Sequence, residues 1–255
     1  MLEVKNMWKS FNLGTDHEIN VFRNFSLSFI EGESTAIVGA NGCGKSTLLN
    51  LISGSLPLDS GKILLKGRDI SLLPEEKRSS NIGRVHQNPS FGVSPSLTIL
   101  ENLALANKKG DSFSLRNLVK KDSIPFYKEL LKTLDLGLEN KIHTQVKFLS
   151  GGQRQSLSLL MATMKDPDLL LLDEHTAALD PKTSFVVMEK TKELIEKNNI
   201  TTVMISHNMS DALKYSQRII MMDKGEVILD KRSCDVSEKE LLDIYTKQLV
   251  KKITA

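Results

Sequence analysis

The stretch Gly39-Ala-Asn-Gly-Cys-Gly-Lys-Ser-Thr47 decides the fold of this 255-residue chain. It has the pattern G-x-x-x-x-G-K-[ST], with a short apolar run, Thr35–Val38, before it and a helical stretch, Lys45–Ser53, after it. Glycines let successive backbone N–H groups point inward at phosphate oxygens, and a helix N-terminus adds amide donors and partial positive charge. The sequence therefore predicts a strand, a phosphate-binding loop and a helix, in that order.

Three residues of this loop have predicted roles. Lys45 is expected to reach the β- and γ-phosphates of a nucleotide, Ser46 to ligate Mg²⁺, and Thr47 to bond a nearby phosphate oxygen. Cys43 occupies a free position of the pattern, where an inert filler and a site of redox control both remain open. The nucleotide-binding residues expected from the loop are Gly39, Asn41, Gly42, Cys43, Gly44, Lys45, Ser46 and Thr47.

A second pattern, Asp168-Leu-Leu-Leu-Leu-Asp-Glu174, indicates a buried strand that ends in two carboxylates. Ligands of open α/β sheets bind at the carboxyl ends of the strands. Asp173 is thus expected to hold Mg²⁺ through its waters, and Glu174 to polarise an attacking water. Many strands end in acidic turns, so the pattern indicates hydrolysis only in combination with the phosphate loop.

The pentapeptide Leu149-Ser-Gly-Gly-Gln153 precedes a predicted helix and forms a second candidate anion site. Ser150 and the amides of Gly151, Gly152 and Gln153 lie where a helix N-terminus attracts negative charge. One protomer that binds one ATP does not need two such sites. The second site is therefore predicted to close on the ATP of a partner copy, in a homodimer.

Elsewhere strands and helices alternate, which favours a parallel sheet covered on both faces. We expect residues 1–87 to form the first part of the core with an antiparallel β subdomain, 88–165 a helical subdomain, 166–236 the second part of the core, and 237–255 a helical tail. The segment Lys108–Ser123 has five basic and two acidic residues. It is expected to be a solvated surface, with contact to a membrane subunit or lipid headgroups as the alternative.

Composition excludes several classes of function. The 34 basic and 31 acidic residues give a net charge of +3, too balanced to indicate nucleic acid as the main partner. The two cysteines, Cys43 and Cys234, have no metal-site spacing and fit a reducing cytosol. The N-terminus has no signal-peptide pattern, and no apolar run approaches the roughly 20 residues that span a bilayer. If the protein functions at a membrane, it is therefore expected to do so by binding another subunit that spans the membrane.

The order of motifs resembles that of the ATP-binding cassette (ABC) family over essentially the whole chain. The motifs are the phosphate loop, Gln87, Leu149–Gln153, Asp168–Glu174, Ala177-Ala-Leu-Asp180 and His207. The resemblance implies an α/β P-loop NTPase (RecA-like) fold, with a parallel sheet core, an antiparallel β subdomain and an inserted helical subdomain. It also implies ATP and Mg²⁺ as cofactors, and a Mg-dependent ATPase coupled to transmembrane transport.

The resemblance also implies further residue roles. Gln87 is similar to the glutamine that contacts Mg²⁺ and water and senses the membrane partner. Asp180 resembles the interface aspartate that links the two sites of the dimer. His207 resembles the histidine that holds the γ-phosphate and orients Glu174. Residues Ser150–Gln153 match the signature that clamps the γ-phosphate across the dimer.

Two positions depart from the family pattern. Phe11 stands where a tyrosine of the family usually stacks on adenine, and its ring keeps the π-face that stacking needs. Two alternatives remain open: Phe11 is a core residue, or Trp8 is the residue that stacks on adenine. His175 stands where proline usually follows the catalytic glutamate. His175 and His86 match no family role and are expected to be packing or surface residues. No position required for hydrolysis is missing, so we expect an active enzyme.

The system that such an ATPase is expected to serve is a multi-subunit transporter. We expect a peripheral protein at the cytoplasmic face of the cell membrane, bound to integral permease subunits and supplied by an extracytoplasmic substrate-binding lipoprotein. Residues 173–183, 157–163 and 206–213 resemble stand-alone bacterial ATPases linked to import of aromatic amino acids such as tryptophan and tyrosine. The alternatives are an ATPase of a soluble assembly complex, such as iron–sulfur cluster assembly, and a nucleotide-gated translation or DNA-repair factor.

Overall fold

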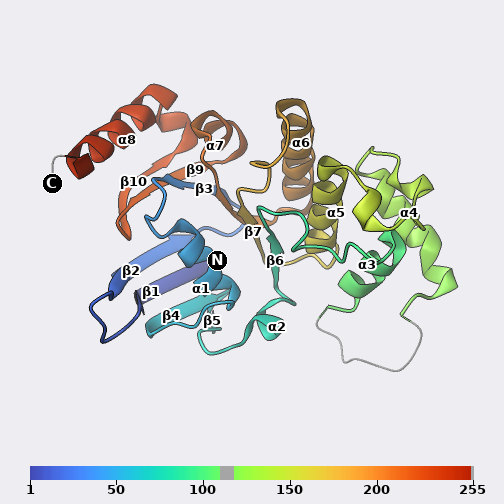
Figure 1. The fold of residues 1–255 in the computed structure, drawn as a ribbon, viewed down its shortest axis with the longest axis horizontal. Helices are drawn as coiled ribbons and strands as arrows, with labels where there is room; N and C mark the ends of the chain where they lie inside the picture. The colour runs from blue at the N-terminus through green and yellow to red at the C-terminus, as the bar shows by residue number, and fades with distance from the viewer. Residues whose placement is uncertain (110–117, 254–255) are drawn as a thin grey trace. The chain divides into compact units, whose positions relative to one another are not determined.

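A computed structural model describes residues 1–109 and 118–253, and the chain divides into two compact units (Figure 1). The first unit comprises Met1–Arg78 and Asn199–Ala255, and the second Ser79–Asn198. In the described ranges, no helix combines the length and apolar character needed to cross a membrane. The predicted basic segment 108–123 lies partly outside the described residues, because 110–117 are not among them.

The first unit contains an antiparallel sheet in the order β2-β1-β4-β5 (Figure 1). Alternate residues of β1, Leu2, Val4 and Met7 among them, are buried, as expected for a strand with one covered face. The four strands are β1 (Leu2–Phe11), β2 (Ile19–Phe29), β4 (Ser60–Leu65) and β5 (Arg68–Asp69). A loop of residues 12–18 connects β1 to β2.

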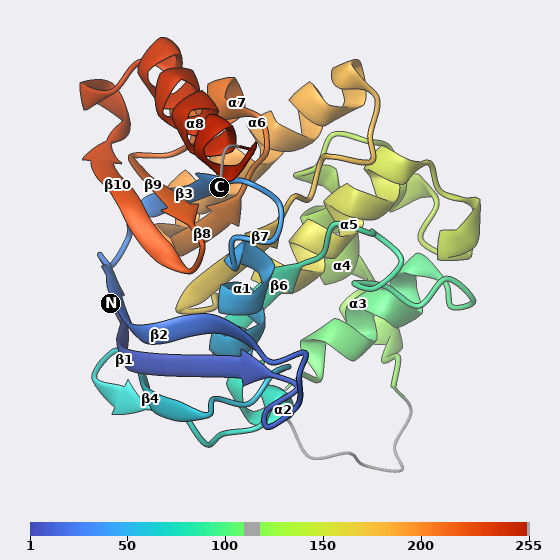
Figure 2. The ribbon, with the colours of Figure 1, turned by 60° about the vertical axis from the view of Figure 1, so that its left-hand side comes forward.

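The same unit contains four further strands in the order β10-β9-β3-β8. Strand β3 is parallel to both β8 and β9, whereas β9 and β10 form a hairpin across Lys224-Gly225. The strands are β3 (Ser34–Gly39), β8 (Thr201–Ile205), β9 (Arg218–Asp223) and β10 (Glu226–Arg232). Helix α1 (Lys45–Ser53) lies on one side of this sheet, and α7 (Met209–Tyr215) and α8 (Glu238–Ile253) lie on the other (Figure 2).

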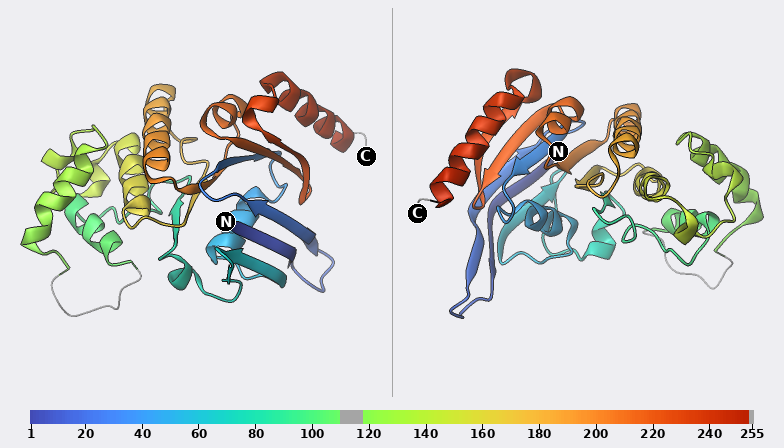
Figure 3. Two further views of the ribbon diagram at one scale, coloured as in Figure 1. Left: turned by 180° about the vertical axis from the view of Figure 1, so that it is seen from behind. Right: turned by 45° about the horizontal axis from the view of Figure 1, so that its top comes forward.

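The second unit pairs β6 (Ile82–Val85) in parallel with β7 (Leu169–Asp173). Helix α5 (Gly151–Thr163) packs against β6, and α6 (Pro181–Asn198) packs against α5 (Figure 3). All four leucines of β7 have no exposed surface, which explains its continuous apolar sequence. The two carboxylates that follow are therefore held at the end of a fully buried strand.

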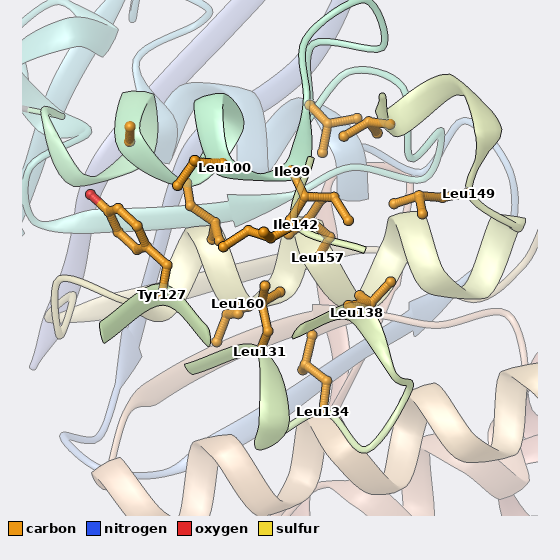
Figure 4. Packing of buried hydrophobic residues seen from close by; sticks show 14 residues of the cluster. Ile99, Leu100, Tyr127, Leu131, Leu134, Leu138, Ile142, Leu149, Leu157 and Leu160 are labelled. Atoms are coloured by element: carbon orange, nitrogen blue, oxygen red, sulfur yellow. The ribbon is translucent and has the colours of Figure 1, made fainter. Parts of the chain in front are cut away.

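The helices α3 (Ile99–Asn107), α4 (Ile124–Lys132) and α5 enclose a separate apolar cluster (Figure 4). Ile99, Leu131, Leu138 and Leu157 are completely buried in it. The hydroxyl of the buried Tyr127 has a hydrogen-bond partner, because it accepts from Asn107 Nδ2 at 3.2 Å. The helices thus have a hydrophobic core of their own, built from residues between 93 and 160.

The strand and helix expected on either side of the phosphate loop agree with β3 and α1 within one residue. Helix α1 begins and ends where predicted, and Gly54 ends it in a left-handed conformation. Short elements were not predicted, namely the two-residue strand β5, the one-turn helix α2 (Glu75–Arg78) and the 3₁₀ turns of the described residues. They are too short to have a periodic pattern. The α/β fold class predicted from the sequence is confirmed.

Candidate active site

The predicted phosphate loop connects β3 to α1 in the first unit. Gly39 has φ 147°, and a Cβ placed on it would lie 2.2 Å from the carbonyl oxygen of Met222. Any side chain there would push β3 away from β9, so glycine is required by the approach of two backbones. Inside the loop, Cys43 N donates to Ala40 O at 3.3 Å and closes a tight turn.

Lys45 lies over this loop and is buried. Its Nζ donates to the carbonyl oxygens of Gly39 at 2.7 Å and Ala40 at 3.0 Å. The first turn of α1 contains no acidic residue, and among the described residues no side chain caps it. Its amides and the Lys45 ammonium together suit an anion, while the Ser46 hydroxyl is exposed beside them. The loop therefore has the chemistry that a nucleotide phosphate needs.

Cys43, the free position of the pattern, is buried inside the loop. Its Sγ lies 3.8 Å from Lys45 Nζ and would be 3.1 Å from a Cβ at position 39. The thiol fills space between the loop and its lysine, as expected for a packing residue. Of the four other loop residues predicted to bind nucleotide, Asn41 and Gly42 are exposed, Thr47 is half-buried and Gly44 is buried.

Two aromatic side chains near the end of β1 are candidate adenine platforms. Phe11 is 36% exposed and Trp8 is 42% exposed, so neither is a core residue. Lys9 Nζ lies 5.5 Å from the centre of the Phe11 ring and is fixed by Asp59 at 2.7 Å. The core alternative for Phe11 is therefore excluded, and the role of adenine platform stays a prediction.

His207 follows β8 in the first unit and is exposed. It lies in a short turn between Ser206 and Asn208. Ser206 Oγ accepts from Asn208 N at 3.1 Å. The Asn208 side chain caps α7, because its Oδ1 accepts from Asp211 N at 3.1 Å. These bonds define the backbone on both sides of the histidine. The γ-phosphate contact expected for His207 stays a prediction.

In the second unit, the two carboxylates after β7 have different partners. Asp173 Oδ2 lies 3.4 Å from Arg84 Nη2, and both side chains are largely buried. Glu174 Oε2 accepts a hydrogen bond from Gln87 Nε2 at 3.1 Å. Glu174 has φ 46°, the left-handed region that few residues other than glycine adopt. The fold thus brings together Gln87 and Glu174, two residues predicted separately.

The pentapeptide motif starts α5 with a reciprocal capping box. Ser150 Oγ accepts from Gln153 N at 3.3 Å, and Gln153 Oε1 accepts from Ser150 N at 3.2 Å. A Cβ on Gly152 would lie 2.2 Å from Thr183 Cγ2 in α6, so this glycine is needed for helix packing. The exposed Ser150 and Gly151 stay available at a helix N-terminus, which attracts anions.

Asp180 caps the next helix, α6. Its Oδ1 accepts from Thr183 N at 3.1 Å, and hydrogen bonds from Thr183 lower the pKa of the Asp180 carboxyl below its ordinary value. The sequence-based role for Asp180 is a link across the dimer. In the protomer it is an exposed N-cap, and the interface role stays a prediction.

Several side chains that support these residues have no sequence signal. Gln155 Nε2 donates to His86 O at 3.2 Å, and Arg154 Nη1 donates to Ser90 Oγ at 3.3 Å, so α5 holds the segment around Gln87. His86 itself is half-buried, with its ring edge-on to Phe91. Each contact joins positions more than 60 residues apart, which is why patterns along the chain did not indicate them.

His175 is buried, as expected for a packing residue, and its ring contacts α6. Burial lowers the pKa of His175 to about 4, so the imidazole is neutral near pH 7. Its Nε2 lies 3.2 Å from Thr191 Oγ1.

Comparison with known proteins shows the family. The model of the ABC transporter family matches residues 22–177. A tyrosine transport ATP-binding protein of Clostridioides difficile (strain R20291) is 44% identical over 252 residues, which are 99% of this chain and 98% of that protein. The spermidine/putrescine import ATP-binding protein PotA of Pasteurella multocida (strain Pm70) is 33% identical over 94% of this chain, which spans 60% of that protein.

A solved structure is similar as well. The dimeric post-hydrolysis state of the ATP-binding cassette MJ0796, bound to ADP and Pi, has a TM-score of 0.77 and 30% identity, and covers 91% of this chain and 99% of that chain. The chain therefore belongs to the ABC transporter family and is one of its ATPases. The family predicted from the order of motifs is confirmed.

Proposed function

We propose that the chain binds Mg-ATP between two copies of itself, and that hydrolysis drives import of a small solute through integral permease subunits. The main support for ATP hydrolysis is the hydrogen bond from Gln87 Nε2 to Glu174 Oε2, at the end of a buried strand. A carboxylate held by an amide donor in this way is suited to orient a water molecule for attack.

The residues predicted from the motifs are assigned to the nucleotide and its metal ion. Phe11 stacks on adenine, the amides of residues 39–47 and Lys45 bind the phosphates, and His207 contacts the γ-phosphate. Ser46, Asp173 and Gln87 offer hydroxyl, carboxylate and amide oxygens, which are the donors that Mg²⁺ prefers. Gln87 donates to Glu174 through Nε2, so its Oε1 is the atom suited to a cation or its water. Bound Mg²⁺ supplies neutralisation of phosphate charge.

The partner copy is proposed to supply Ser150–Gln153 and Asp180. The N-terminus of α5 gives partial positive charge and exposed donors for the γ-phosphate. The MJ0796 cassette, whose post-hydrolysis state with ADP and Pi is dimeric, supports this arrangement. Binding of two ATP molecules would close the dimer, and hydrolysis would release it. In this cycle the helical subdomain, residues 88–165, would pass the movement to the permease.

The proposed cargo is an aromatic amino acid. The support is the 44% identity, over 99% of the chain, to a protein named for tyrosine transport. The proposal places the subunit peripherally at the cytoplasmic face of the membrane, with a lipoprotein receptor on the other side.

The test is reconstitution of the ATPase with a co-purifying permease in vesicles, followed by uptake of labelled tyrosine, tryptophan and, as a comparison, putrescine. ATP-dependent uptake of the aromatic amino acids alone is expected, and Glu174→Gln is expected to abolish it. Uptake of putrescine alone would overturn the cargo. Co-purification with soluble proteins only would favour an assembly complex instead.

A further inference from the structure

The backbone of Glu174 needs support from its surroundings. Its φ of 46° lies in the left-handed region, which a residue with a side chain adopts only where neighbouring structure holds it. On the N-terminal side, β7 is anchored by four fully buried leucines. On the C-terminal side, the carbonyl oxygen of Glu174 accepts from Ala177 N at 3.0 Å. These contacts define the chain before Glu174 and the turn after it.

The residue that follows, His175, is fixed from the other side by α6. It is 2% exposed, and its Nε2 lies 3.2 Å from Thr191 Oγ1. Thr191 uses its single hydroxyl proton to donate to Val187 O at 2.8 Å. Because that proton is committed, Thr191 can only accept from the imidazole, so the hydrogen-bond network assigns the proton of His175 to Nε2.

We propose that His175 is a positioning residue, whose Nε2–H···Thr191 bond holds the adjoining Glu174 carboxylate at Gln87. This inference rests on the proposed function, in which Glu174 orients the attacking water. A packing residue would need only the right volume. A positioning residue needs a donor at the Nε2 position as well, because the hydrogen bond fixes the direction of the ring and of the peptide that joins it to Glu174.

The two alternatives are separated by a pair of substitutions in the full-length chain. His175→Gln keeps an N–H donor near the Nε2 position, whereas His175→Leu keeps apolar volume and removes the donor. We expect His175→Leu to lower kcat for ATP about 10-fold with KM for ATP unchanged, since displacement of a reacting group affects turnover more than binding. We expect His175→Gln to restore kcat to within about 3-fold of the parent.

Removal of the acceptor gives an independent test if His175→Leu does not fold. Thr191→Val is expected to reduce kcat to a similar extent, and the double variant to be no slower than either single one, because both changes break the same bond. Thr163→Val is the matched control. Thr163 is also buried and donates to the carbonyl of the residue four positions before it, Leu159, but it does not contact His175. Its kcat is expected to stay at the parent value.

The outcomes distinguish this inference from the proposed function. Parent-like kcat in both His175→Leu and Thr191→Val, with Glu174→Gln inactive, would overturn the positioning role alone. An equal loss of kcat in His175→Gln and His175→Leu would show that the donor is irrelevant and would also overturn it. Parent-like turnover in Glu174→Gln would instead overturn the proposed function, on which the inference depends.

Discussion

Gln87 donates from Nε2 to Oε2 of Glu174 over 3.1 Å. Gln87 follows β6 and Glu174 follows β7, and these strands are paired in parallel, so the two carboxyl ends lie at one edge. The acidic end of a predicted strand indicates Glu174, and the resemblance to the ABC family indicates Gln87; the parallel pairing explains why they meet.

Lys45→Ala is expected to raise the Kd for ATP at least about 10-fold. The ammonium of Lys45 is held by the Gly39 and Ala40 carbonyls at the loop, where phosphate charge would be neutralised. Titration calorimetry with ATP measures the change, and Lys62→Ala, which removes an exposed lysine of the same unit, is the control. Equal affinities in the two variants would count against the phosphate-loop assignment.

Ser150→Arg is expected to prevent ATP-driven dimerisation while the monomer still binds ATP. The exposed N-cap of α5 would lose its hydrogen bond, worth about 1 kcal/mol of stability, and gain a long cation where the partner's nucleotide must approach. Light scattering after gel filtration reports the mass with and without ATP. Thr133→Arg adds the same side chain at another exposed position of the second unit and should dimerise. A normal dimer in Ser150→Arg would exclude the composite site.

Arg78→Leu is expected to lower the free energy of unfolding by about 3 kcal/mol. The buried guanidinium donates to four carbonyl oxygens, those of Leu51, Ile52, Ser71 and Leu73, at 2.7 to 2.9 Å. Two of them belong to the last turn of α1, whose carbonyls have no partner within the helix. Urea denaturation measures the loss. Arg78→Lys should be intermediate, and a loss below about 1 kcal/mol would show that water replaces these bonds.

Acid is expected to destabilise the chain partly through His175. Burial lowers the pKa of His175 to about 4 from an ordinary value of 6.5, so the unfolded chain takes up the proton first. The stabilisation is complete above pH 6.5 and is lost as the pH falls toward 4, by about 3 kcal/mol. Urea denaturation at pH 7.5 and 4.5 should show a smaller pH effect in His175→Gln than in the parent. Equal effects would contradict a buried neutral imidazole.

Much of the fold follows from local signals. Gly44 and Gly54 mark the two ends of α1, the apolar leucines of 169–172 indicate a buried strand, and Ser150 with Gln153 indicates the start of α5. Residues 39–47, 173 and 174 were predicted from patterns with a fixed spacing, whereas Gln87 was predicted from the resemblance to the ABC family.

The supporting contacts could not be predicted, for a physical reason. Arg78 finds acceptors up to 27 positions away, and Asp173 meets Arg84 89 positions away, so each pairing exists only after the elements have packed. The sequence shows His175 only as a departure from the family's proline. Its contact with Thr191 depends on how α6 lies against the end of β7.

Turnover and dimerisation of the Glu174→Gln variant, measured together with ATP and magnesium, test the central claim most directly. General-base assistance contributes about 10²- to 10⁴-fold to rate, so we expect phosphate release to fall at least about 100-fold. Because the phosphate loop and Ser150–Gln153 are unchanged, we expect ATP to drive stable dimerisation of this variant. Parent-like phosphate release, or a chain that stays monomeric with ATP, would contradict hydrolysis at a site shared by two copies.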